Sequence, residues 1–62
     1  MFENLKKNDA LFIASNRGGY DYNKVFFVEQ TADSITIFDF VNNQEREIPK
    51  DFILEIRKLW IL

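Results

Sequence analysis

The 62-residue sequence contains no cysteine and no histidine. Disulfide bonds, thiol chemistry and the usual zinc ligand sets are therefore excluded. Catalysis is disfavoured as well, because a general base would have to be a carboxylate whose pKa is raised in a dry pocket. No Asp-x-Asp calcium loop and no phosphate-binding glycine motif is present. We therefore expect a protein that is not an enzyme and that holds no metal and no cofactor.

The chain also lacks a large excess of either charge, since it has ten acidic and eight basic residues and a net charge of −2. This balance argues against a generic phosphate binder and against a nucleic-acid mimic. No stretch approaches the length of a membrane span, and acidic and basic residues precede the first apolar run. We expect no membrane association, no signal peptide and a cytoplasmic location.

What the chain has in quantity is apolar surface, with 47% hydrophobic and 16% aromatic residues. We expect one domain over residues 1–62, near the lower limit at which a core holds without disulfides or metal. The alternative for so short a chain is to bury more surface by assembling with copies of itself or with partners, so a homo-oligomer stays open.

The apolar pattern predicts an all-β fold, because short runs of β-branched and aromatic residues alternate with polar ones. In the second run, four consecutive apolar residues predict burial on both faces or a bulge between Phe26 and Phe27. The last run fits an amphipathic helix over residues 51–62 as an alternative, but we favour a strand. The expected strands span residues 9–15, 24–30, 34–41, 44–48 and 54–59.

Residues 34–53 are predicted to form a β-hairpin that leads through a short turn into one further strand. With Asn42-Asn43 as a two-residue turn, Phe40 faces Glu45, Asp39 faces Arg46 in an ion pair, and Ile37 faces Ile48. Period-two alternation then places Ile35, Ile37 and Ile48 on one face and Phe38 and Phe40 on the other. Pro49 ends the strand, since it cannot donate to a ladder, and Lys50-Asp51 suits a single helical turn.

The order of these elements resembles the Src-homology-3-like small barrel, and the resemblance spans most of the chain. It is carried by residues 9–13, 24–28, 34–37 and 48–53. The resemblance implies a five-stranded barrel with a one-turn helix before the last strand. This fold hosts peptide binders, RNA and DNA binders, chromatin readers and subunits of larger machines, so it assigns no function by itself. Its proline-binding members carry paired tryptophans, whereas this chain has only Trp60.

The one long irregular stretch, residues 16–23, holds both glycines and both tyrosines, and such a loop is exposed and able to bind. Arg17 with the following glycines and Tyr20 looks like one copy of an RNA-binding Arg-Gly-Gly element, or else the glycines only make a turn. Tyr20 and Tyr22 flank one residue and so project to the same side. They form either a binding platform or a cover over the open end of the barrel.

Phe38 and Phe40 are the sharper candidates for a working surface. If the three isoleucines fill the barrel, both rings lie outside, framed by Glu45 and Glu47, as an exposed aromatic strip. The alternative is that strand curvature turns one ring inward. Trp60 lies in an apolar chain end that we expect to dock on its own barrel or on a second subunit.

We expect the chain to be a protein-interaction module, acting as an adaptor, an inhibitor or a subunit of a larger assembly. Small acidic proteins of this size are typical of phage and mobile-element genomes, which is an expectation about class. An alternative function is single-stranded nucleic-acid binding through the stacking residues. A third is a small-molecule-binding oligomer with a pocket between subunits. The candidate partner-binding residues are Arg17, Tyr20, Tyr22, Phe38, Phe40 and Trp60.

Overall fold

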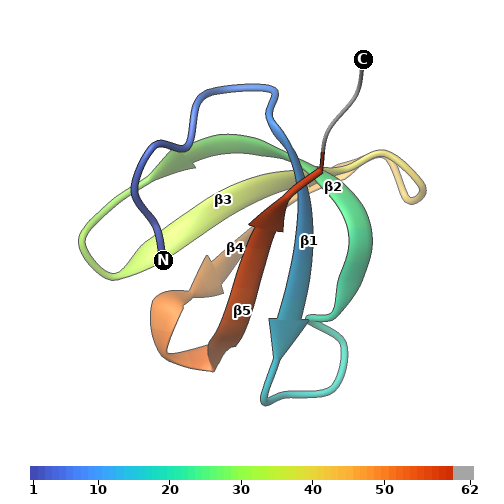
Figure 1. Cartoon of the computed structure of the whole chain (residues 1–62). Coiled ribbons are helices and arrows are strands. Elements are labelled where there is room, and N and C mark those ends of the chain that lie inside the picture. The colour runs from blue at the N-terminus through green and yellow to red at the C-terminus, as the bar shows by residue number, and fades with distance from the viewer. Residues whose placement is uncertain (60–62) are drawn as a thin grey trace.

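Five antiparallel strands and one short turn of helix make up the fold (Figure 1). The computed structural model describes residues 1–59, and the predicted all-β class and the helical turn before the last strand are confirmed there. Residues 53–58 form a strand, so the helical alternative for this segment is wrong. The elements are β1 (Ala10–Ser15), β2 (Tyr22–Gln30), β3 (Ser34–Asp39), β4 (Gln44–Pro49), the 3-10 helix η1 (Lys50–Phe52) and β5 (Ile53–Lys58).

The strands form one sheet in the order β4-β3-β2-β1-β5, so β4 and β5 are its two edges. Only the three residues of η1 join these edges, and a chain that short requires the sheet to curl upon itself. Figure 1 shows this curl, with β4 and β5 turned toward each other. The edges are not hydrogen-bonded to one another, so the sheet is barrel-like but not closed.

The inner face of the curled sheet holds the core. Leu11 and Ile13 on β1 are fully buried, while Phe12 between them points outward and is half-buried, as the alternation predicts. Burying one such aliphatic side chain contributes roughly 1.5–3 kcal/mol, so these few residues dominate the stability. Within residues 1–59, the largest fully buried side chains are Leu11, Ile13, Val25, Ile35, Ile37 and Ile48.

The β3–β4 hairpin has the predicted faces but not the predicted register. Ile48 lies opposite Ile35, and Gln44 lies opposite Asp39, which shifts every expected pair by two residues. The loop therefore has four residues, 40–43, with Asn43 at a φ of 53°. A shift of two residues leaves each side chain on its original face, and so the three isoleucines are buried as expected.

The predicted Asp39–Arg46 cross-strand pair is wrong for the same reason. The Asp39 carboxylate turns into the loop, where it accepts hydrogen bonds from the Val41 N–H (3.1 Å), the Asn42 N–H (3.3 Å) and the Asn42 side-chain amide (2.8 Å). By accepting these hydrogen bonds, the Asp39 side chain stabilises a four-residue loop in place of the predicted two-residue Asn42-Asn43 turn. Arg46 lies opposite Ile37 instead.

An irregularity in β2 bends the sheet. The pairing with β3 shifts between Phe27 and Glu29, one residue beyond the predicted position, and Val28 takes up the extra length. A second irregularity, between Leu11 and Ile13, interrupts the pairing of β1 with β2. Bulges increase the local twist, and here they let the long β2 pair with β1 and β3 on a strongly curved sheet.

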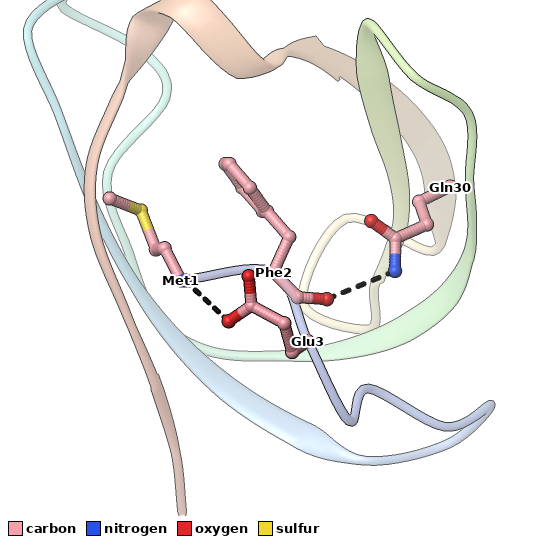
Figure 2. A network of polar contacts seen from close by, with 4 residues as sticks. All are labelled: Met1, Phe2, Glu3 and Gln30. Atoms are coloured by element: carbon pink, nitrogen blue, oxygen red, sulfur yellow. Dashed lines mark hydrogen bonds and ion pairs between the residues drawn. The ribbon is translucent and has the colours of Figure 1, made fainter.

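The first nine residues pack along the curled sheet. Phe2 and Leu5 contact the core, and the side-chain amide of Gln30 donates to the Phe2 carbonyl at 3.1 Å (Figure 2). The terminal ammonium group of Met1 lies 2.7 Å from the Glu3 carboxylate. Within residues 1–59, no helix is long and apolar enough to cross a membrane.

Candidate binding site

The β1–β2 loop folds back onto η1. The Asn16 N–H donates to the Phe52 carbonyl at 2.8 Å, and the Asn16 side-chain amide donates to the Asp51 carbonyl at 3.2 Å. This places the Arg17 guanidinium 4.5 Å from the centre of the Phe52 ring. Tyr20 meets the same ring edge-on, with centroids 5.3 Å apart and planes at 69°. Phe52 is thus covered by two of the predicted site residues.

Arg46, on β4, contacts the other side of this loop through hydrogen bonds and ring stacking. Its Nη1 atom donates to the Gly19 carbonyl and to the Tyr22 hydroxyl, both at 2.8 Å. Its guanidinium also lies 4.4 Å from the centre of the Tyr20 ring. Both tyrosines are half-buried and pack against the core. This placement agrees with the interpretation that the rings cover the sheet, and their use as a binding platform stays a prediction.

Phe38 and Phe40 lie on the outer face but differ in exposure. Phe38 is half-buried and lies opposite Phe26 on β2, whereas Phe40 begins the hairpin loop and is 44% exposed. The Phe26 and Phe40 rings contact each other, with centroids 5.3 Å apart and planes at 42°. The strip therefore has one accessible ring, Phe40, which packs against the partly covered ring of Phe26.

An open hollow of about 430 Å³ adjoins Phe40. Tyr22 and Phe40 both line this hollow, so the structure brings together one residue from each predicted group. Val41, on the rim, is 77% exposed and is the most exposed large apolar residue within residues 1–59. The lining residues are Asp21, Tyr22, Asn23, Lys24, Asp39, Phe40, Val41 and Asn42.

Two of the charged side chains that line the hollow, Asp39 and Lys24, differ in their exposure to solvent. Asp39 is only 4% exposed, and its hydrogen bond from the Asn42 side chain, with the two loop N–H groups and Arg46, holds its pKa below the usual range. Burial opposes this shift without cancelling it. Lys24 is exposed, with its ammonium group 5.9 Å from the Phe26 ring centre, and no ion pair within residues 1–59 includes it. The hollow thus offers the Lys24 cation beside apolar surface, while its other exposed charge, the Asp21 carboxylate, accepts hydrogen bonds from Ser15.

Sequence reasoning overlooked three of the residues that build this region. Val41 was placed in a strand, where it would have been paired, and the longer loop exposes it instead. The pattern predicts Lys24 only as a strand residue and predicts no binding role for Phe52. Asn42-Asn43 is the available signal of a loop tip, and Val41 directly precedes it. Trp60 lies outside the described residues.

Comparison with protein-family models, with curated proteins and with solved structures finds no match for this chain. The residues themselves therefore carry the functional argument. Within residues 1–59, no group of three or more acidic side chains is placed to hold a metal ion.

Proposed function

We propose that the chain is a protein-interaction module that binds a partner protein through Phe40, Val41 and the adjoining hollow, without catalysing a reaction. The observation that carries this proposal is the pairing of two adjacent exposed apolar residues with a concave surface. Aromatic and aliphatic anchors beside a pocket are the usual centre of a protein interface.

Support for Phe40 as the anchor comes from its packing. The Phe26 ring holds it from one side, and a ring that is already ordered loses little conformational entropy when a partner covers it. Lys24 adds a charge that a carboxylate on the partner would match. The proposal therefore extends to a partner segment with an apolar side chain for the hollow and an acidic residue next to it.

The proposal also includes the fold family, cellular role, location and origin of the module. The strand order and the short turn before the last strand support a relationship to Src-homology-3-like barrels. A role as adaptor, inhibitor or assembly subunit, a cytoplasmic setting and a phage origin are expectations for the class of small acidic proteins. None of these refinements is needed for the binding surface itself.

The test is affinity capture from native host lysate with the tagged chain, with and without nuclease. F40A and V41A are expected to lose a protein that the unaltered chain retains in both conditions. L54A is the matched control, since Leu54 is 61% exposed but lies on β5. Circular dichroism checks that each variant keeps its strands. Equal capture by F40A and L54A would refute the proposed surface.

Single-stranded nucleic-acid binding is the second candidate, favoured by the exposed Arg17 over the Phe52 ring. Arginine and aromatic side chains of this kind stack on bases. Binding to a mixed oligonucleotide would then weaken steeply with salt, because counterions are released. R17A is expected to reduce such binding, while K7A, which removes an exposed charge away from the loop, changes it less. Absence of binding at low salt excludes this function.

A further inference from the structure

The free edge of β5 has a charge pattern that is complementary to itself. Glu55 and Arg57 point to the same face of the strand and contact each other at 2.8 Å, with side chains 50% and 65% exposed. Their positions flank Ile56 symmetrically. If a second copy of β5 runs antiparallel with Ile56 on the two-fold axis, Glu55 of each copy lies opposite Arg57 of the other.

The backbone of β5 is free to make this pairing. Leu59 donates to the Ala10 carbonyl at 2.8 Å, and hydrogen-bonded pairs alternate along an antiparallel ladder. Arg57 is therefore the next residue bonded to β1, which leaves the N–H and C=O groups of Ile56 and Lys58 on the outer edge. No strand within residues 1–59 pairs with that edge. In the two-fold register, Ile56 of both copies would exchange hydrogen bonds.

Neighbouring registers are disfavoured by the same side chains. A two-fold axis at Glu55 places two glutamates opposite each other, and an axis at Arg57 does the same with two arginines. Like charges directly opposite destabilise a strand pair. The register centred on Ile56 is therefore the one in which both charged pairs attract.

The other sheet edge, β4, lacks these properties. Lys50 donates to the Asp33 carbonyl at 2.8 Å, so alternation leaves Glu45, Glu47 and Pro49 facing outward on β4. Pro49 has no N–H to donate, and a two-fold axis at Glu47 would bring acidic side chains together. The features that disfavour pairing between two copies at β4 are accordingly absent from β5.

We propose that two copies of this chain associate through an antiparallel β5–β5 pairing centred on Ile56, which joins their sheets across a two-fold axis. The interface is isologous, because each strand supplies the same residues. It lies apart from the hollow, so this inference does not rest on the proposed function.

A charge-swap experiment tests this pairing. Sedimentation equilibrium of the unaltered chain is expected to show a reversible monomer–dimer equilibrium. E55R leaves two positive residues on each strand, and R57E leaves two negative ones. Each variant alone should need a concentration at least about tenfold higher to dimerise, because two attractive pairs become repulsive. An equimolar mixture of the two should recover a one-to-one dimer.

Controls with the same change in net charge are E29R and K7E, which alter exposed residues away from β5 and should dimerise like the unaltered chain. F40A should also dimerise normally, which separates this interface from the partner surface. A chain that is monomeric at every concentration, a mixture that does not recover the dimer, or assembly beyond a dimer would each overturn the proposal.

Discussion

The guanidinium group of Arg46 donates to the hydroxyl of Tyr22 across 2.8 Å and so ties an edge strand to the beginning of β2. The same side chain donates to the Gly19 carbonyl and stacks on Tyr20. One arginine therefore fixes the loop that covers Phe52 and also orients Tyr22, which lines the hollow. Arg46 does not line the hollow, but it positions one wall of the candidate site.

This relationship predicts energetic coupling between the two residues. Y22F removes one hydrogen bond and should lower the free energy of unfolding by about 1 kcal/mol. R46M should lower it further, because it also removes the stacking on Tyr20. In the double variant the two losses should not add, since both remove the same bond. Urea unfolding of the four proteins measures the coupling, and strictly additive losses would contradict it.

The inner and outer faces of the β3–β4 hairpin should lose different amounts of stability on truncation. I37A creates a cavity in the core and is expected to cost about 2–5 kcal/mol of unfolding free energy. F40A removes a ring that is 44% exposed and should cost about 1 kcal/mol or less. F38A, at a half-buried site, should fall between them. Urea unfolding midpoints give this order directly, and a larger loss for F40A than for I37A would show that the ring belongs to the core.

The face on which each strand residue lies was predictable, because it depends only on whether its position along the strand is odd or even. Ile35, Ile37 and Ile48 stay on one face whether the hairpin loop has two residues or four. The loop length depends on Asp39, whose carboxylate binds three loop donors, and no local pattern distinguishes this use from a cross-strand ion pair. The hollow follows from that loop length. It was therefore beyond prediction, although Tyr22 and Phe40 were each identified separately.

The two adjacent glycines of the β1–β2 loop offer a matched pair of substitutions. An added Cβ would meet no atom within 4 Å at either glycine, so the two positions are equally open. They differ in the backbone, since Gly19 has a φ of +87°. Any cost of alanine at position 19 is therefore backbone strain, of about 1–2 kcal/mol. G18A should be close to neutral. Thermal unfolding of both variants tests this difference, and equal melting temperatures would contradict it.

The lowered pKa of Asp39 predicts that the hairpin loop contributes stability only while this carboxyl is ionised. Because the pKa is lower in the folded than in the unfolded state, the contribution is complete above the unfolded value of about 3.9. It is lost as the pH falls through the folded value. Glu3 and Asp9 also have lowered pKa values, so the acid response of the unaltered chain sums several groups.

Comparison with D39N isolates the contribution of this one carboxyl. Asparagine can still accept hydrogen bonds from the loop N–H groups, but it carries no charge and does not titrate. The unaltered chain should be more stable than D39N at pH 7, and the difference should shrink as the pH falls below about 4. The amide resonances of Val41 and Asn42, followed by NMR, should titrate at the folded pKa in the unaltered chain and stay fixed in D39N. A stability difference that persists unchanged in acid would mean that Asp39 acts through shape, with no contribution from its charge.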